Sequence, residues 1–346
     1  MKRIMLFISF LFFAGLVSAH PGKKVTTFPA PEAFCTGLTF DGALLWVADY
    51  KTDLLYSVNP QNGEVVRSIP APGFWPAGLA WDGDYLWNID SKQKKLFKVN
   101  PQTGTILTVL PAPCSNPEGL VWFEETLWIS DSRANEIYKI DIQDGTAVHT
   151  IAAPAKSAHG LAFDGQYFWC ADRNMDEIYM LEPESGEVII VSDAPGPYAR
   201  GLTWDGEFLW SIDYETDQLY KVVRQDKDLY RLENKRHARV TLTHQIKGYG
   251  LGEINKADVF FALPQDLPQQ KIINLDLEPN ADTVTDIWKQ EFARFTFSDI
   301  ASGTPAESKM VVETEISGIH YYIFPDQVGT LDDIPAEILD LYTRDG

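Results

Sequence analysis

The sequence predicts an all-β protein in which a five-bladed β-propeller is followed by an antiparallel β-sandwich and a short terminal helix. Three observations lead to this prediction. Each of the first four repeats contains four short apolar runs separated by turn residues, the pattern of a propeller blade. The segments after residue 238 are rich in β-forming residues but carry no repeat. The dipeptide Gly-Leu returns every 41 residues without an insertion, at Gly37, Gly78, Gly119, Gly160 and Gly201.

The first repeat shows how one blade is built. Residues 37–40 and 44–47 are expected to form two strands joined at Asp41-Gly42, because Asp-Gly favours the positive φ of a type I′ hairpin turn. Residues 54–58 are the expected third strand and residues 64–69 the fourth, with a Gly-containing turn between them. Four such strands make one sheet.

The fifth repeat loses this pattern after Tyr220, where a charged stretch replaces its fourth strand. Residues 24–31, which precede the first repeat, have the missing fourth-strand pattern. We therefore expect the N-terminal segment to complete the last blade and to close the ring, which removes the exposed sheet edge of an open array.

Two further residue types recur at the same position in every repeat, and each such set of equivalent positions is called a column. Because a residue repeated in every blade at a mid-strand position is best explained by packing between sheets, we expect the Trp column in the core, rather than on a surface that stacks sugars. The Asp column at the end of each second strand is expected to cap loop N–H groups rather than to form a ring of catalysts. The columns are Trp46, Trp87, Trp128, Trp169 and Trp210, and Asp49, Asp90, Asp131, Asp172 and Asp213.

The chain opens with two basic residues, an apolar stretch and a small-residue site ending at Ala19, the pattern of a signal peptide over residues 1–19. We thus expect a secreted or periplasmic protein without membrane insertion. The expected parts are a propeller over 20–230, a linker over 231–238, a sandwich over 239–330 and a short helix with a tail over 331–346. The sandwich strands are expected at 239–245, 257–263, 271–277, 290–297, 309–315 and 320–324.

The net charge argues against some classes of partner, and the cysteines limit the disulfides that can form. With 29 basic and 49 acidic residues, the net charge of −20 argues against nucleic acid and anionic membranes as partners. Cys170 falls in a strand pattern and is expected in the core, whereas Cys35 and Cys114 fall in loops between blades. They form the only plausible disulfide pair in an oxidising compartment.

Candidate site residues come from positions that differ between the repeats. In propellers, the loops between blades and the loops after the second strands emerge on one face, at the mouth of the channel, where function concentrates. The residues before the repeat Gly are Thr36, Ala77, Glu118, His159 and Arg200. Glu118 is the candidate general acid or base, with His159 and Arg200 as its partners. The candidate ligand-binding residues of the loops are Trp75, Tyr198, Tyr50, Arg133, Asp172 and Arg173, with Lys51, Asp131 and Tyr214 beside them.

The alternative is that these loop residues vary because they are unconstrained surface. The sequence contains no HExxH, GxSxG, CxxC or phosphate-binding Gly-rich loop, so it predicts no metal and no cofactor.

Residues 34 to about 222 resemble the secreted propellers of the glutaminyl cyclotransferase type, which convert N-terminal glutamine to pyroglutamate. The matching elements are residues 34–38, Phe-Cys-Thr-Gly-Leu, and residues 117–120, Pro-Glu-Gly-Leu. The family has Thr-Gln where this chain has Cys35-Thr36, and its Glu lies one repeat earlier than Glu118. The resemblance implies that Glu118 acts as a general acid or base in this chain.

Residues 236–346 are similar to the β-sandwich that precedes the core of secreted transglutaminase-like proteins, on the strength of residues 260–264 and 269–272. The papain-like core of that family would follow near Ile338 and is absent from this sequence, so the chain is expected to be either a fragment or a family member without that core. Since no cysteine follows Cys170, transglutaminase chemistry is not expected of this chain.

Two functional classes remain. The favoured one is an exported binding or scaffold module that captures a peptide or small ligand, or another exported protein, at the channel mouth, as an accessory to a transglutaminase-like or peptidase-like system. The alternative is a glutaminyl-peptide cyclotransferase that uses Glu118.

Overall fold

The computed structural model describes residues 20–225 and 229–343, apart from the side chains of residues 341–343. The expected signal peptide over residues 1–19 lies outside these ranges. The chain divides into two compact units, residues 1–229 with Tyr322–Asp326, and residues 230–321 with 327–346. Within the described ranges, no helix is long and apolar enough to cross a membrane.

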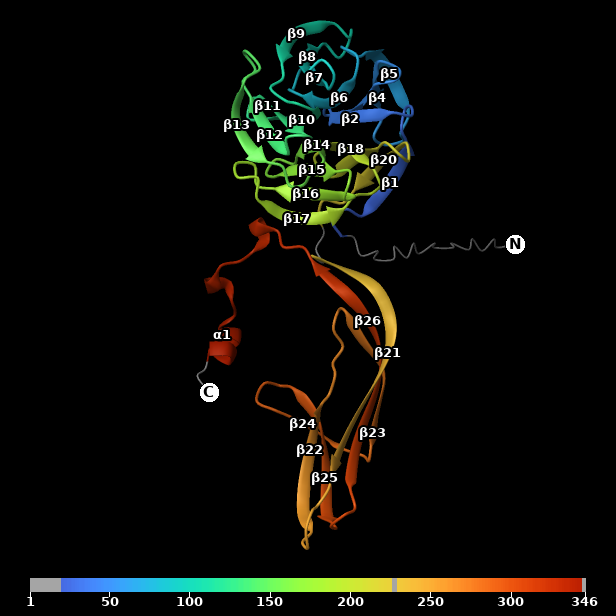
Figure 1. Ribbon diagram of the computed structural model, residues 1–346, viewed down its shortest axis with the longest axis vertical. Helices are drawn as coiled ribbons and strands as arrows, with labels where there is room; N and C mark the ends of the chain where they lie inside the picture. The colour runs from blue at the N-terminus through green and yellow to red at the C-terminus, as the bar shows by residue number, and fades with distance from the viewer. Residues whose placement is uncertain (1–19, 226–228, 344–346) are drawn as a thin grey trace, which may run out of the picture. The chain divides into compact units, whose positions relative to one another are not determined.

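The first unit is a ring of five four-stranded antiparallel sheets, counted over its described residues (Figure 1). The first is β2 (Cys35–Phe40), β3 (Leu45–Asp49), β4 (Leu54–Val58) and β5 (Val65–Pro70); the second is β6 (Pro76–Trp81), β7 (Leu86–Asp90), β8 (Lys95–Val99) and β9 (Ile106–Pro111). The third is β10 (Pro117–Phe123), β11 (Thr126–Asp131), β12 (Glu136–Ile140) and β13 (Ala147–Ala152); the fourth is β14 (Ala158–Phe163), β15 (Phe168–Asp172), β16 (Glu177–Leu181) and β17 (Val188–Asp193).

The last sheet is closed by the N-terminal strand, as the sequence predicts. It consists of β18 (Ala199–Trp204), β19 (Leu209–Asp213), β20 (Gln218–Val222) and β1 (Lys24–Pro29). Strand β1 pairs antiparallel with β20, and Thr27 lies opposite Tyr220. The two ends of the repeat region are thus joined by backbone hydrogen bonds.

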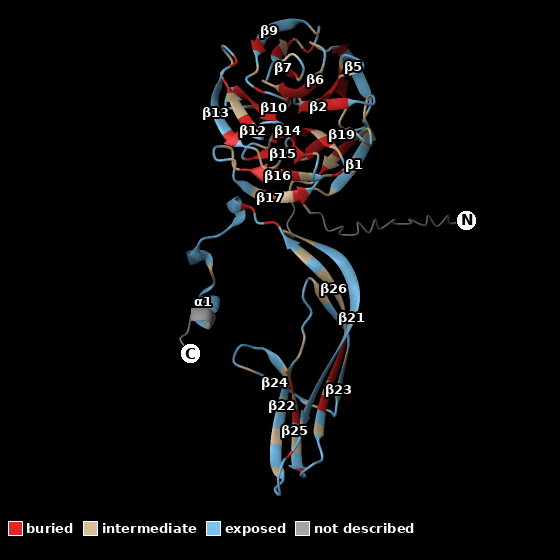
Figure 2. Cartoon of the chain, in the orientation of Figure 1, coloured by how far each residue is buried: buried red, intermediate tan, exposed pale blue. Residues whose placement is uncertain are grey.

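The first strand of each blade lies at the centre of the ring, and each contacts the first strands of both neighbouring blades, including β18 with β2. Figure 2 shows that the inner strands are buried and the outer ones largely exposed. The repeated Trp side chains are at most 3% exposed and lie in the cores between blades. The core interpretation of the Trp column is therefore confirmed.

The second unit contains two three-stranded antiparallel sheets, β21-β26-β23 and β22-β25-β24. Its few buried side chains lie mainly on the central strands of the two sheets, such as Phe295 on β25 and Met310 on β26. The unit is all-β, as expected. Its strands are β21 (Tyr230–Ile246), β22 (Ile254–Ala262), β23 (Gln270–Glu278), β24 (Asp282–Thr285), β25 (Glu291–Ile300) and β26 (Ala306–Tyr321), followed by the 3₁₀ turns Pro325–Gln327 and Leu331–Asp333 and by α1 (Ala336–Thr343).

Three expectations about this unit need correction. Residues 231–238 are not a linker, because they form the first half of β21, which pairs with β26. The strands expected at 309–315 and 320–324 are not separate, since β26 runs on through Gly318 to Tyr321. The segment Tyr322–Asp326 then belongs to the first unit, where Tyr322 and Phe324 are buried in the cluster that contains Trp169.

The expected disulfide is absent: Cys35, Cys114 and Cys170 are all free thiols. Cys35 is the first residue of β2 and not, as expected, part of a loop, and it lies in the core between the fifth and first blades, whereas Cys114 lies in the core between the second and third. Burial raises the pKa of the Cys114 thiol to about 12 and that of Cys35 still further. Cys170 is fully buried, as expected.

Candidate functional site

Three columns of the repeat converge at one end of the ring, where the inner strands begin and the second strands end. They lie three residues before the repeat Gly, one residue before it, and thirteen residues after it. Members of all three columns line a cavity of about 420 Å³. Its lining residues are Tyr50, Trp75, Ser91, Lys92, Asn116, Glu118, Arg173, Tyr198, Arg200 and Tyr214.

The Asp column holds the loops that carry these residues. In the second blade, Asp90 Oδ2 accepts hydrogen bonds from the N–H groups of Phe74 and Trp75, while Oδ1 accepts from those of Lys92 and Gln93. One buried carboxylate thereby fixes both the loop before the blade and the loop after its second strand. The capping interpretation of this column is confirmed.

Asp172, which we also expected among the ligand-binding residues, has this structural role instead. It is fully buried, and its two oxygens accept hydrogen bonds from the N–H groups of Ser157, Asn174 and Met175. Its carboxylate therefore serves the loops and does not line the cavity.

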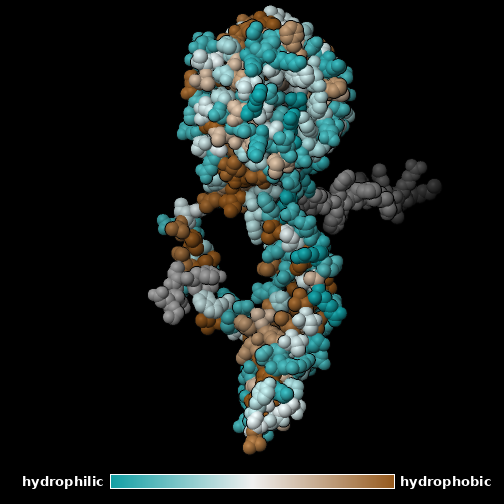
Figure 3. Space-filling model, viewed as in Figure 1, coloured by the Kyte–Doolittle hydropathy of each residue, from teal (hydrophilic) through white to brown (hydrophobic). Residues whose placement is uncertain are grey.

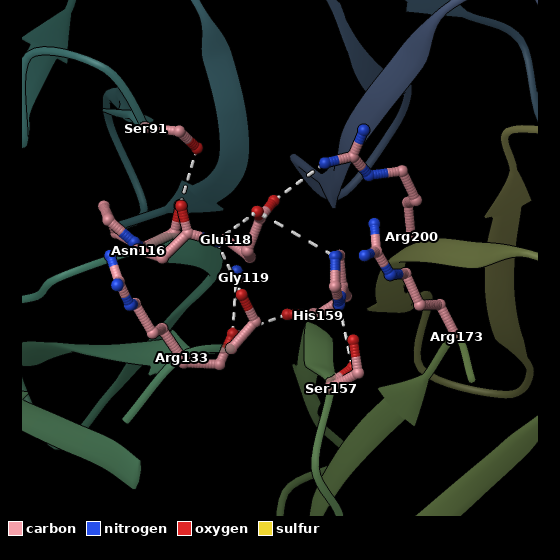
Figure 4. Close-up of polar contacts among 12 residues, drawn as sticks. Ser91, Asn116, Glu118, Gly119, Arg133, Ser157, His159, Arg173 and Arg200 are labelled. Atoms are coloured by element: carbon pink, nitrogen blue, oxygen red, sulfur yellow. Dashed lines mark hydrogen bonds and ion pairs between the residues drawn. The ribbon is translucent and has the colours of Figure 1, made fainter. Parts of the chain in front are cut away.

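Glu118 lies at the centre of the polar side of the cavity (Figure 4). Its Oε2 is 2.8 Å from Nη2 of Arg200, and both side chains are about nine-tenths buried. Asn116 Nδ2 donates to Oε1 of Glu118 at 3.0 Å and to Oγ of Ser132 at 2.6 Å. The carboxylate is thus ion-paired on one side and hydrogen-bonded on the other, which fixes its orientation.

His159 lies behind this carboxylate and is only 1% exposed. Because the Ser157 carbonyl can only accept, Nδ1 of His159 carries a proton and donates to it at 2.8 Å. Burial lowers the pKa of His159, with Arg200 acting in the same direction and Glu118 against it. The ring is therefore neutral near pH 7, and its unprotonated Nε2 lies 3.9 Å from Oε1 of Glu118 without a hydrogen-bond partner among the described residues.

Aromatic rings form another part of the lining. Tyr50 stacks on Trp75 with ring centroids 4.0 Å apart, and its hydroxyl is 2.8 Å from that of Tyr214. Tyr214 in turn packs against Tyr198 at 5.4 Å. Desolvation and the Tyr214 hydroxyl raise the pKa of Tyr50 to about 12, so the Tyr50 hydroxyl is uncharged near pH 7. A flat or apolar group can pack here, with hydroxyls available at the edge.

Arg173 is the second cation of this site. Its Nη1 donates to the Tyr198 hydroxyl, and its guanidinium lies over the Tyr198 ring, 5.1 Å from the centroid. The Nε atom is buried and has no hydrogen-bond partner among the described residues. In Figure 4 its guanidinium lies beside His159, on the same side of Glu118 as Arg200.

Most of the predicted site residues are brought together. Glu118, Arg200, Arg173 and the aromatic residues line the cavity, and His159 contacts Glu118 from beneath it. Arg133 does not line the cavity, although Figure 4 draws it near Asn116. Sequence reasoning missed Asn116, Ser91 and Lys92.

A signal for two of the missed residues was present. Asn116 occupies the column of Trp75 and Tyr198, and Ser91 that of Tyr50 and Arg173. Following each column through all five repeats, rather than selecting its aromatic and charged members, would have identified both.

Comparisons with known proteins support the fold of the first unit. No family model and no curated protein matches the sequence. Among solved structures, the glutaminyl cyclase of Myxococcus xanthus aligns with a TM-score of 0.52 at 16% identity, over 58% of this chain and 94% of that one. A nidogen/laminin complex aligns at a TM-score of 0.44 and 20% identity, over 56% of this chain and 77% of that one. A virginiamycin B lyase from Staphylococcus aureus aligns at a TM-score of 0.37 and 18% identity, over 57% of this chain and 68% of that one.

The first of these likenesses shows that the repeat region is a β-propeller. At 16% identity this likeness establishes the fold alone. The chemistry of the site must be argued from its own residues.

Proposed function

We propose that this chain is an exported protein with a five-bladed propeller whose channel mouth captures a peptide or another small ligand. One observation carries the proposal: a cavity of about 420 Å³ is lined both by aromatic rings and by a fixed polar cluster contributed by the third, fourth and fifth blades. Binding sites for small molecules likewise combine apolar and aromatic walls with a few precisely placed polar groups.

The polar cluster is arranged for holding a ligand. Glu118 is paired with Arg200 and fixed by Asn116, so no side-chain reorientation is needed for a ligand to meet an ordered surface. Such preorganisation lowers the entropic cost of binding. Unconstrained surface loops, the alternative interpretation of these positions, would not supply buried and mutually bonded side chains from blades 82 residues apart in sequence.

A retention experiment tests this function. The chain starting at residue 20 is equilibrated with a randomised tripeptide pool and with a pool of aromatic small molecules, and the retained compounds are quantified by mass spectrometry. We expect retention from at least one pool, reduced about tenfold or more by Trp75→Ala, because truncating a central aromatic anchor commonly costs 2 kcal/mol or more.

Phe74→Ala is the matched control. Phe74 precedes Trp75 in the same loop but is 72% exposed and does not line the cavity. Its removal should leave retention unchanged. Equal retention by the chain and by the Trp75→Ala variant would contradict binding at this cavity.

The second candidate is glutaminyl-peptide cyclotransfer, favoured by the position of Glu118 next to a neutral imidazole in a propeller that is similar to a glutaminyl cyclase. In this reaction the N-terminal amine attacks the γ-carboxamide carbon, the new C–N bond closes the ring, and ammonia leaves. Glu118 would move the proton from the amine to the departing nitrogen.

Release of pyroglutamate from a Gln-initiated dipeptide separates the two candidates. The binding proposal predicts no turnover and only a small loss of retention in Glu118→Gln, which keeps the size of the side chain and one of its two acceptor oxygens. Turnover by the chain that disappears in Glu118→Gln would instead establish the cyclotransferase.

A further inference from the structure

The charges around the cavity are opposite in sign to those of the chain as a whole. The whole chain carries a net charge of −20. The residues that line the cavity include three cations, Lys92, Arg173 and Arg200, and one carboxylate, Glu118. Since side chains in a partly closed site interact more strongly than exposed ones, this local excess of positive charge bears directly on the ligand.

Arg200 does not contribute to this excess, because it is paired with Glu118 at 2.8 Å. The uncompensated charges are those of Lys92, which is exposed and lies over the Trp75 ring, and Arg173. Among the described residues, no carboxylate forms an ion pair with Arg173. Its contacts are with the Tyr198 hydroxyl and ring, which are neutral groups and leave its charge unbalanced.

The geometry of Arg173 is that of a prepared binding group. Tyr198 fixes the plane of the guanidinium through one hydrogen bond and one ring contact. The buried Nε of Arg173 has no hydrogen-bond partner among the described residues and is covered by protein, so a ligand would meet the other N–H groups of the guanidinium. Planar guanidinium groups held in this way bind carboxylates through two parallel hydrogen bonds.

Glu118 supplies a second requirement. Its carboxylate lines the cavity and is an acceptor, whereas His159, whose Nε2 has no partner among the described residues, is 99% buried and does not line the cavity (Figure 4). A ligand that places an N–H or O–H group on Glu118, with an acceptor of its own against Arg173, would pair with both of these lining groups.

We propose that the ligand of this cavity carries a carboxylate, held by Arg173, with a neighbouring N–H or O–H group directed at Glu118 and with a flat or apolar part against Trp75 and Tyr50. This inference rests on the proposed binding function and specifies its ligand class. Two sources share the chemistry: the C-terminal residue of a peptide, in which an amide N–H adjoins the carboxylate, and a small aromatic carboxylic acid.

The test uses matched pools that differ only in the charged group. Tripeptides with a free C-terminal carboxylate are compared with the same tripeptides amidated at the C-terminus, and aromatic carboxylic acids with their primary carboxamides. We expect the acid member of at least one pair to be retained about tenfold or more over its neutral counterpart, because hydrogen bonds to charged groups contribute about 1.5–3 kcal/mol. The pair that shows the preference identifies the source.

Arg173→Gln should abolish this preference while leaving the melting temperature close to that of the unmodified chain. Lys51→Gln is the charge-matched control: it removes a cation from a corresponding loop in the first blade, and Lys51 does not line the cavity. It should leave the preference intact, which would exclude a general effect of net charge.

The outcomes separate the two proposals. Retention of neutral pools that depends on Trp75 but shows no acid preference would overturn the carboxylate assignment and leave the binding function standing. An acid preference that persists in Arg173→Gln would also overturn the assignment. Retention of none of the four pools would contradict both proposals.

Discussion

At the scale of single residues, a broken repeat reveals how each Trp of the core is held. In four blades the indole Nε1 donates to the Asp of the first hairpin, at 2.7 to 2.9 Å; the pairs are Trp46 with Asp41, Trp87 with Asp82, Trp169 with Asp164 and Trp210 with Asp205. In the third blade that position is Phe123, and Nε1 of the buried Trp128 has no partner among the described residues.

This difference predicts unequal costs for one substitution. Trp46→Phe removes a hydrogen bond to a carboxylate, whereas Trp128→Phe removes none. Both Trp46 and Trp128 have a cation over the ring, so this contact does not distinguish the two substitutions. We expect Trp46→Phe to lower the free energy of unfolding by about 1–2 kcal/mol more than Trp128→Phe, as measured by denaturant titration. Equal losses would show that the indole hydrogen bonds contribute nothing beyond packing.

The sequence predicts the members of the site better than their pairing. Glu118, His159 and Arg200 share one column, so the ring must bring them to one end, and that convergence is visible in the repeat. The pairs that they form depend on the length of each side chain and on how neighbouring blades are placed around the ring. The ion pair of Glu118 with Arg200, the unpartnered Nε2 of His159 and the contact of Arg173 with Tyr198 therefore emerge only from the structure.

At the scale of elements, the repeat Gly exists because neighbouring inner strands approach too closely for a side chain. A Cβ at Gly119 would lie 1.9 Å from the carbonyl oxygen of His159, and one at Gly37 equally close to that of Ala77. Both contacts are with backbone atoms of the next blade, so neither can be relieved by rotating a side chain. The repeated Gly, which is the most regular feature of the sequence, thus marks the place where neighbouring blades contact one another.

Gly119→Ala should consequently destabilise the propeller by about 1–3 kcal/mol or more, the usual cost of overpacking a tight interior. Because Gly119 adjoins Glu118, the same change should displace the carboxylate and reduce ligand retention. Gly252→Ala is the control, since nothing lies within 4 Å of a Cβ there. Thermal unfolding checks both variants, and an unchanged melting temperature in Gly119→Ala would refute the role assigned to the column.

Two strand boundaries of the second unit were harder to predict because the residues there show no apolar alternation. Residues 231–238 are charged and mostly exposed within β21, so no alternation distinguishes them from a linker. Strand β26 continues through Gly318, which lies opposite Glu233, where the pairing with β21 shifts register. Backbone pairing, not side-chain pattern, sets these boundaries. Periodicity therefore fails here while it succeeds in the propeller, where every inner strand is buried.

At the scale of the molecule, the ring depends on joining residues that are nearly two hundred positions apart. Strand β1 supplies the outer edge of the last sheet, and the N–H of Gly22 extends the pairing to the carbonyl of Val223. The sequence alone predicted this closure, because the last repeat lacks its fourth strand and a segment with the fourth-strand pattern precedes the first repeat. The inner contact of β18 with β2 is the second closure.

Removing β1 separates the two closures. A chain starting at residue 31 keeps the contact of β18 with β2 but leaves β20 as an unpaired edge. We expect its melting temperature to fall by at least about 5 °C relative to the chain starting at residue 20, and we expect self-association on size-exclusion chromatography, because free strand edges pair with other chains. A chain that ends at residue 330 is the control, since it loses C-terminal residues outside the propeller unit. A monomeric chain with an unchanged melting temperature would mean that the inner-strand contact alone holds the ring, and that β1 covers an edge without closing the fold.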